Sequence, residues 1–183
     1  RIAVTFDDGF ESIFRNAIPE MICRGIPATV FVPSHYLGER PGWITDSSYP
    51  AFNERVASAD MLRAYPPSLV TIGSHGVHHV RLALRSMEAA REELWRSKQE
   101  LKMLTGRDIT LFAFPYGSFT PPILDLAKEM GYKAVYSNLP DFSPARHNGY
   151  LIARTAVSPR DWRIEFRLKL RGAYEWHRTA VIL

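Results

Sequence analysis

Cysteine is almost absent from this sequence. Cys23 is the single cysteine among 183 residues, so an internal disulfide is excluded. It lies in an apolar stretch with helical spacing, where we expect it to be buried as a small hydrophobic side chain. One thiol does not reveal whether the protein works in an oxidising or a reducing compartment.

Long apolar runs are missing as well. No stretch of about 18 apolar residues is present, so we expect no membrane span. The sequence has no initiator Met, and Arg1 leads directly into a strand-like segment without a signal sequence. We therefore expect a processed or trimmed piece of a longer protein.

The chain also lacks a block of charge of one sign. Its 23 basic and 19 acidic residues give a formal charge of +4. The basic residues are scattered, and their densest group, between residues 160 and 171, is typical of the solvated face of a helix. This charge permits an acidic glycan as partner without requiring one, and we expect no nucleic acid partner.

What the chain does have is the composition of an ordinary globular protein, 46% hydrophobic and 23% charged. Its length fits one domain over residues 1–183. Seven strand-like apolar runs cover residues 2–6, 28–32, 69–72, 110–114, 134–136, 151–154 and 179–183. Helical patterns cover residues 12–24, 86–104, 121–130 and about 160–170. This alternation predicts an α/β fold with a parallel sheet, either closed into a barrel or open and doubly wound.

A polar segment over residues 37–58 interrupts the pattern. It contains several Gly, Pro, Ser and Asp residues and is too broken for a core element, so we expect a long surface loop. Loops of this length inside compact domains are often functional. Trp43 and Tyr49 either line a sugar site there or simply anchor the loop.

Two neighbouring carboxylates, Asp7 and Asp8, follow the first strand and precede Gly9. Adjacent carboxylates raise each other's pKa unless a cation neutralises one of them. The pair therefore indicates a metal site or an acid/base couple, and the alternative is a pair of helix N-cap residues. Gly9 permits the sharp turn that brings the pair together.

Three histidines within five positions, His75, His78 and His79, follow the third strand. On a helical turn, His75 and His79 would project from one face and meet a single cation. Two histidines and one aspartate leave a coordination position open for water, as in catalytic sites. Because both motifs follow parallel strands, whose carboxyl ends share one edge, we expect them to meet.

At this point the sequence resembles the NodB-homology polysaccharide deacetylases, also called carbohydrate esterase family four. The matching blocks are Thr-Phe-Asp-Asp-Gly at residues 5–9, the strand at residues 26–32, the Gly-Ser-His motif within residues 72–79, and Phe-Ala-Phe-Pro-Tyr-Gly at residues 112–117. The resemblance extends to about Val157. It implies a single-domain, distorted parallel (β/α)7 barrel, TIM-like in architecture, and so settles the choice that periodicity leaves open.

The resemblance also implies a hydrolase acting on carbon–nitrogen bonds other than peptide bonds. Such an enzyme removes N-acetyl groups from N-acetylglucosamine units of a polysaccharide and releases acetate. By the same resemblance, Asp8, His75 and His79 would bind a divalent metal, usually zinc, and Asp7 would be the general base. A bound divalent metal lowers the pKa of its water and polarises the acetamide carbonyl.

Two further positions acquire roles from the resemblance. The backbone N–H of Tyr116 would stabilise the oxyanion, and Tyr116 with Pro115 would form part of the sugar-binding wall. The substrate partner would be an N-acetylated polysaccharide or oligosaccharide. Since such polymers lie outside the cytoplasm, an extracytoplasmic or cell-envelope location is expected.

The sequence departs from the family pattern in two places. Many members have arginine at the position of Ala113, where it orients the base. Arg154, near the end of a later strand, would orient Asp7 instead. The alternatives are that Arg154 is only a surface or helix-facing arginine, or that Arg146, in a loop between Pro144 and Gly149, is the partner of Asp7. The family's Leu-x-His motif, which supplies the general acid, does not occur before the chain stops at Leu183, and the acid stays unassigned, with His147 as one candidate.

Two other functions remain open at this stage. The first is a glycan-binding protein that keeps the fold and metal without catalysis, against which the intact Asp7 argues. The second is a hydrolase of small-molecule amides or O-acetyl esters that uses the same metal.

Overall fold

Residues 2–138 and 149–171 are described by the computed structural model of the chain. A six-stranded sheet forms its centre, and all neighbouring strands are parallel in the order β1-β2-β3-β4-β5-β6. The strands are Val4–Phe6, Ala28–Val32, Val70–Ser74, Leu111–Ala113, Ala134–Ser137 and Leu151–Ala153. The seventh expected strand, residues 179–183, lies outside the described residues.

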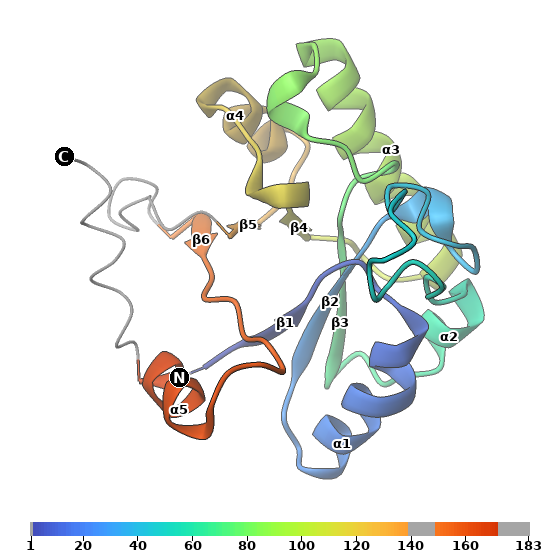
Figure 1. Ribbon diagram of the computed structural model, residues 1–183. Helices are drawn as coiled ribbons and strands as arrows, with labels where there is room; N and C mark the ends of the chain where they lie inside the picture. The colour runs from blue at the N-terminus through green and yellow to red at the C-terminus, as the bar shows by residue number, and fades with distance from the viewer. Residues whose placement is uncertain (1, 139–148, 172–183) are drawn as a thin grey trace, which may run out of the picture.

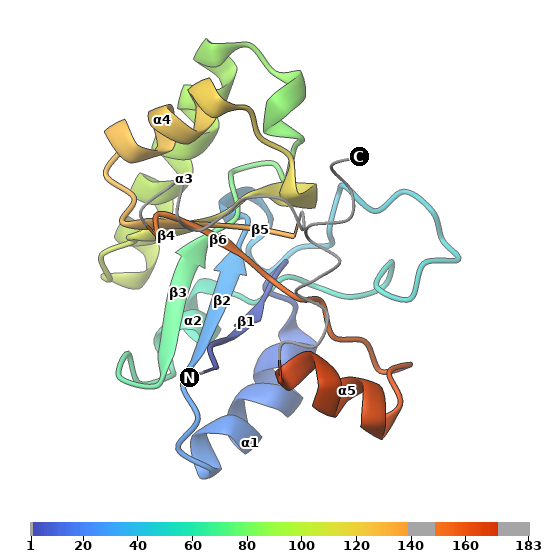
Figure 2. The ribbon, with the colours of Figure 1, turned by 90° about the vertical axis from the view of Figure 1, so that its left-hand side faces the viewer.

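The sheet curls into a partial barrel that helices cover from outside (Figure 1). The helices are α1 (Ile18–Cys23), α2 (Ala59–Arg63), α3 (Met87–Thr105), α4 (Pro121–Glu129) and α5 (Arg163–Leu170). Figure 2 shows that β6 crosses the molecule on the side of β1, so the two edge strands face each other across the open side of the curled sheet. The barrel predicted by the family resemblance is therefore confirmed as the fold class.

The central strands are buried on both faces, as parallel strands covered by helices must be. Four of five residues in β2 and four of five in β3 are buried. The register pairs Val30 with Ile72 and Phe31 with Gly73. A methyl group on Gly73 would lie 2.5 Å from the Phe31 ring, so only glycine leaves room for that ring inside the barrel.

Helix α3 follows from its sequence signals. The Ser86 side chain accepts a hydrogen bond from the Ala89 N–H at 3.2 Å, and Gly106 ends the helix in the left-handed conformation. Its buried residues recur at helical spacing: Ala90, Glu93, Leu94, Ser97, Leu101 and Thr105. This face packs against the sheet, and it carries two polar groups, Glu93 and Ser97, into the interior.

The first predicted helix differs in form. Residues 13–17 form a π-helical turn in which the Ile18 N–H bonds the Ile13 carbonyl, and only then does α1 begin. Pro19 has no N–H to donate to the residue four positions earlier, so a regular α-helix cannot run through it. Cys23 is exposed, and its predicted burial is wrong. It lies five residues after the buried Ile18, about 140° around the helix.

Between residues 37 and 58 the chain forms turns and neither helix nor strand. Isolated bridges from Val56 to Phe10 and to Leu37 hold the two ends of this segment close together. Helix α2, which periodicity did not predict, begins directly after it. Ser58 caps α2 by accepting the Met61 N–H, and Leu62 is its buried residue.

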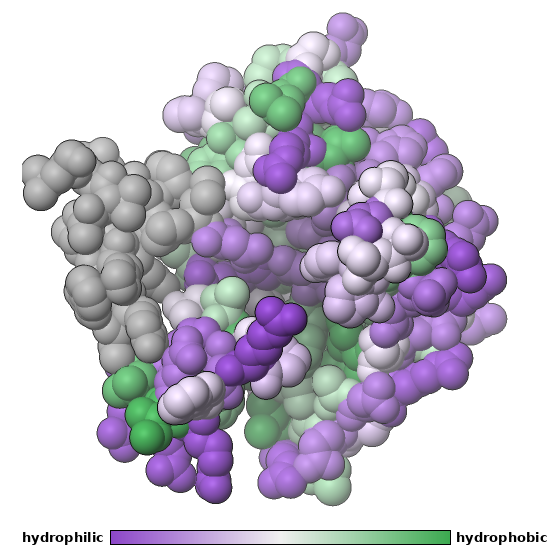
Figure 3. Space-filling model, in the orientation of Figure 1, coloured by the Kyte–Doolittle hydropathy of each residue, from purple (hydrophilic) through white to green (hydrophobic). Residues whose placement is uncertain are grey.

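Helix α5 contains no buried residue. Ile164 and Leu168 are among its exposed hydrophobic residues. Figure 3 shows a hydrophobic patch at the lower left of the surface, where α5 lies in Figure 1. Much of the remaining surface in that view is hydrophilic. No helix in the described ranges is long and apolar enough to cross a membrane.

Candidate active site

Polar side chains from most strands meet at the carboxyl edge of the sheet. Asp7 directly follows β1, His75 follows β3, Tyr116 comes shortly after β4, Asn138 follows β5 and Arg154 follows β6. Four of these five residues line one pocket. The fifth, Arg154, donates a hydrogen bond to Asp7. Functional groups gather at this edge in parallel α/β folds because the strands end there together.

Asp8, His75 and His79 bring one ligand atom each to within 4.8 Å of one another. Asp8 Oδ1 lies 3.6 Å from His75 Nε2 and 3.0 Å from His79 Nε2. Two atoms that each lie about 2.0 Å from a tetrahedral zinc are roughly 3.3 Å apart, between these two distances. The distances from Asp8 to both histidines thus suit a shared cation, and the three predicted ligands form one candidate metal site.

The donor set and its surroundings fit a divalent metal. His75 Nδ1 lies 2.7 Å from the Ala113 carbonyl, so that nitrogen carries the proton and Nε2 is free to be a ligand. Burial lowers the pKa of His75 against the attraction of Asp7 and Asp8, which favours the neutral imidazole that a metal requires. His79 Nδ1 is buried without a hydrogen-bond partner among the described residues.

Residues 75–79 do not form the helical turn that the sequence spacing suggested. They form a bent loop in which Gly76 has φ +81 and His79 has φ +55. Both values are outside the right-handed helical region. The two histidine rings still approach to 4.8 Å between centroids, because the bends turn both side chains toward Asp8.

Asp7 is held by Arg154 through a bidentate pair. Arg154 Nη1 donates to Asp7 Oδ1 at 2.6 Å, and Nη2 donates to Oδ2 at 2.7 Å. Nη1 also donates to the Thr5 hydroxyl at 3.1 Å. The guanidinium comes from the end of β6, whereas the Ala113 position on β4 contributes only a methyl group and the carbonyl that bonds His75.

The pKa of Asp7 lies below its usual value. Burial raises the pKa of this carboxyl, but His75, Arg154 and a hydrogen bond from Asn138 lower it by more. The contribution of Arg154 does not depend on the protonation of His75, because a guanidinium is always charged. Asp7 is therefore kept ionised, as a general base must be.

Positive φ angles outside glycine occur at three of the described residues, and all three are in the site. They are Asp8 at +67°, His79 at +55° and Tyr116 at +58°. A residue with a β-carbon costs about 1–3 kcal/mol in such a conformation and persists only where the surroundings enforce it. Backbone strain is thus concentrated where the two ligand motifs and the Pro-Tyr-Gly turn meet.

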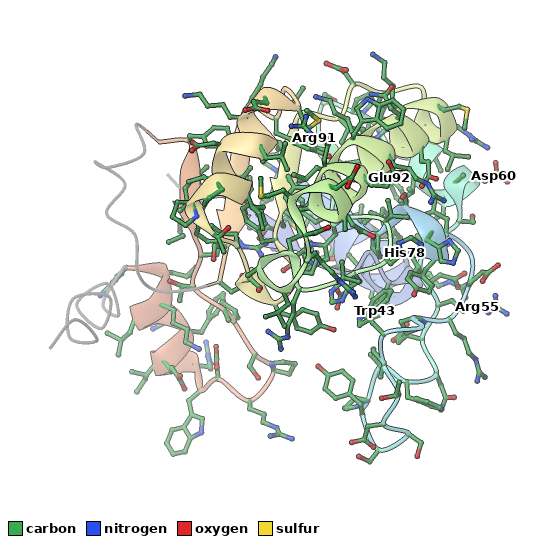
Figure 4. All side chains as sticks on the ribbon, turned by 90° about the horizontal axis from the view of Figure 1, so that it is seen from above. Trp43, Arg55, Asp60, His78, Arg91 and Glu92 are labelled. Carbon is green, nitrogen blue, oxygen red and sulfur yellow. The ribbon has the colours of Figure 1, made fainter. Side chains whose placement is uncertain are left out.

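The pocket above the ligands has a volume of about 430 Å³. Its other wall comes from the loop at residues 37–58, and it is lined there by Trp43, Ile44, Thr45, Asp46 and Tyr49. The Trp43 ring stacks on His79 with centroids 4.4 Å apart and planes at 21°. Figure 4 shows Trp43 at the root of this loop, toward the body of the molecule.

Of the two residues predicted for the sugar-binding wall, Tyr116 lines the pocket and Pro115 does not. Tyr116 is 42% exposed and lines the pocket, with the Arg81 guanidinium 4.0 Å from its ring centroid. Pro115 is buried and is not among the described residues that line the pocket. It lies beside Gly76, where an added β-carbon would come 4.0 Å from its Cγ, so it packs against the histidine loop.

Comparison with known protein families agrees with this geometry. The family model described as polysaccharide deacetylase matches residues 1–135, about three quarters of the chain. The chain belongs to the polysaccharide deacetylase family. The resemblance inferred from its motifs is confirmed.

Relatives of this deacetylase-family chain are distant in sequence. The peptidoglycan-N-acetylmuramic acid deacetylase PdaA of Bacillus subtilis is 24% identical over 137 residues, which cover 74% of this chain and 45% of that protein. The chain spans about half the length of the curated relatives that it matches.

Solved structures of similar fold include a deacetylase of Streptococcus pyogenes and IcaB of Ammonifex degensii. The deacetylase PplD of Streptococcus pyogenes, solved in complex with acetate, has a TM-score of 0.75 at 17% sequence identity. The match covers 91% of this chain and 69% of the PplD chain. IcaB of Ammonifex degensii has a TM-score of 0.67 at 24% sequence identity, and the match covers 87% of this chain and 69% of the IcaB chain. These similarities show a shared fold.

Two site residues had no signal in the sequence. Asn138 follows β5 with no motif around it. Glu93, whose side chain accepts a hydrogen bond from the Val77 N–H between the two histidine ligands, looks in the sequence like one of several acidic residues on an amphipathic helix. His147, the candidate for the missing proton donor, lies outside the described residues. So does Arg146, which competed with Arg154 as the partner of Asp7.

Proposed function

We propose that this chain is a metal-dependent hydrolase that removes N-acetyl groups from N-acetylglucosamine-type units of a polysaccharide and releases acetate. The observation that carries this proposal is the juxtaposition of an ionised, arginine-held Asp7 with the cluster of Asp8, His75 and His79. A protein that only binds a metal and a glycan has no need of the first element. Membership of the polysaccharide deacetylase family supports the reaction class.

Asp8, His75 and His79 would hold the cation, and zinc is the best match to two imidazoles and one carboxylate. When bound, a divalent cation would act as a Lewis acid and lower the pKa of water to about 7. Asp7 accepts the proton of the attacking water, since its carboxylate is ionised and lies beside the ligand cluster. Arg154 keeps both Asp7 oxygens fixed during that transfer.

The acyl oxygen of the substrate becomes negative when water adds to the acetamide carbon. The Tyr116 N–H, in a turn with φ +58, is the backbone donor that the family resemblance assigns to this oxygen. Tyr116 lines the same pocket as Asp7 and Asp8, which supports that role. The amide bond then breaks, acetate leaves, and the sugar nitrogen takes up a proton to become a free amine.

The pocket suits a sugar that carries an acetamido group. Aromatic side chains border it on two sides, with Trp43 and Tyr49 from the loop and Tyr116 opposite. Its volume of about 430 Å³ lies within the roughly 300–1,000 Å³ of small-molecule sites, and its open side allows the rest of a polymer to continue outside. Because such polymers lie outside the cytoplasm, we infer an extracytoplasmic or cell-envelope location.

Acetate release from a panel of N-acetylated substrates tests the proposal. Chitin oligomers, peptidoglycan and an N-acetylglucosamine exopolysaccharide are compared with small acetamides and O-acetyl esters, each with and without a chelator. We expect acetate from at least one N-acetylated glycan, loss with chelator and recovery with zinc. Turnover of only the small amides or esters would overturn the substrate class, and metal-dependent glycan binding without acetate release would identify a binding protein.

A further inference from the structure

Glu93 is a buried carboxylate on α3 that has no part in the chemistry above. Its side chain is 10% exposed, and three of its contacts go to the loop between the two histidine ligands. Oε2 accepts the Val77 N–H at 2.8 Å and the His78 N–H at 3.1 Å, and Oε1 lies 2.6 Å from His78 Nδ1. These contacts bind the interior of the loop and neither of its ends.

The loop needs such an acceptor because its backbone departs from regular structure. Val77 is fully buried, and Gly76 adopts φ +81, which turns two successive N–H groups toward α3. A buried N–H without a partner costs about 1–3 kcal/mol. Glu93 satisfies both of them with one oxygen.

Other contacts fix the remaining sides of the loop. The Gly76 carbonyl accepts the Ser34 N–H at 3.0 Å, and the Val77 carbonyl accepts the His35 N–H at 3.2 Å. Ser97, one helical turn after Glu93, accepts the Ser74 hydroxyl at 2.7 Å. The segment that follows β2 thus donates hydrogen bonds to the loop's carbonyl groups. Glu93 on α3 accepts hydrogen bonds from the loop's N–H groups.

We propose that Glu93 is the positioning residue of the metal site, setting the distance between His75 and His79 by fixing the loop that joins them. This inference rests on the proposed metal-dependent function. A β-carbon at Gly76 would lie 3.0 Å from Glu93 Oε2, so the loop and the carboxylate are in close contact. Without that contact the two histidine rings lose the constraint that keeps their Nε2 atoms on Asp8.

The test measures metal affinity directly, with zinc or cobalt and a competing chromophoric chelator, alongside the thermal midpoint of the metal-free protein. Glu93→Ala removes the acceptor. Glu93→Asp keeps a carboxylate that is too short to reach both N–H groups. Glu93→Gln retains an oxygen for both N–H groups, and its amide can donate to His78 Nδ1 in the other tautomer. Glu92→Ala is the control, since Glu92 is an exposed neighbour on the same helix (Figure 4).

We expect Glu93→Ala and Glu93→Asp to weaken metal binding by about 10–100-fold, as changes beyond the direct ligands typically do. Glu93→Gln and Glu92→Ala should stay within about threefold of wild type, and the cobalt spectrum should change only in the first two variants. Should Glu93→Ala not fold, Glu93→Asp decides the matter.

Wild-type metal affinity in Glu93→Asp, with only a lower thermal midpoint, would mean that Glu93 stabilises the fold alone and would overturn the inference. An equal loss in Glu93→Gln would also contradict it, because that variant preserves the acceptor. A wild-type protein that binds no divalent metal would instead end both this inference and the proposed function.

Discussion

Arg154 and Asp7 join the two edges of the curled sheet. They are 147 positions apart, on the loops that follow β6 and β1, and they meet in a bidentate pair at 2.6 and 2.7 Å. β1 and β6 are the edge strands of the sheet. The pair therefore links the open side of the barrel at the same place where it orients the proposed base, so barrel geometry and base geometry depend on each other.

Replacing Arg154 tests this relationship. Arg154→Lys keeps the positive charge but cannot form two parallel hydrogen bonds to one carboxylate. We expect kcat to fall by about tenfold or more in Arg154→Lys and further in Arg154→Ala, with metal affinity little changed. Acetate release and metal titration measure the two effects separately. Wild-type kcat in Arg154→Ala would refute the orienting role.

Asp7→Asn separates the base from the metal ligands. The amide has nearly the same shape but cannot accept the proton of water. We expect turnover to fall by about 100-fold or more, which is the contribution of a general base, while about one metal ion per chain is still bound. Elemental analysis beside the activity assay checks this. Loss of metal in Asp7→Asn would show that Asp7 and Asp8 have exchanged roles.

Metal removal should lower stability in a concentration-dependent way. A ligand that binds only the folded state stabilises it by about 2.7 kcal/mol at a hundred times its Kd. Thermal unfolding with increasing zinc should therefore show a rising midpoint in the wild type and a flat one in Asp8→Ala, His75→Ala and His79→Ala. Glu92→Ala, a substitution at an exposed residue of α3, is the control and should keep the rising midpoint. A flat response in the wild type would contradict the metal site.

Motif spacing predicted much of the candidate site, because each motif directly follows a strand. Asp7 and Asp8 follow β1 and His75 follows β3, so parallel pairing alone brings them to one edge. The strand pattern also predicted β2 to the residue and the other five described strands within two residues at either end. Strands of this kind are continuous apolar runs, which are visible without any tertiary information.

Other features depend on contacts that no local pattern encodes. The expected helical turn at His75 required right-handed backbone angles, but Gly76 and His79 adopt positive φ. The partners of this loop, Glu93 and Asp8, come from distant parts of the sequence, so no local pattern reveals them. Cys23 was expected to be buried from its apolar neighbours. Cys23 is exposed because α1 turns the face that carries Ile18 toward the core, and the sequence does not show which face that is.

Cys23 supplies a simple check of that correction. An exposed thiol should react with a thiol reagent in the folded protein at a rate close to that in denaturant. A buried one would react only after unfolding. Labelling of about one thiol per native chain within minutes is the expected outcome, and protection until denaturation would restore the original interpretation.

Trp43 tests whether the loop at residues 37–58 belongs to the site. Its ring stacks on His79 at 4.4 Å and lines the pocket, so it contacts both a proposed ligand and the space for substrate. An aromatic pair contributes about 0.5–1.5 kcal/mol, which corresponds to roughly 2–10-fold in an equilibrium constant. We expect Trp43→Ala to raise KM for a glycan substrate by about that factor or more, and Trp43→Phe to restore most of the loss because a ring remains to stack.

Trp95, which is 52% exposed on α3, gives the control Trp95→Phe, and this variant should behave like the wild type. Substrate should also change tryptophan fluorescence in the wild type and in Trp95→Phe, but much less in Trp43→Phe. If Trp43→Ala keeps the wild-type KM and metal affinity, the loop only covers the barrel edge and contributes nothing to substrate binding.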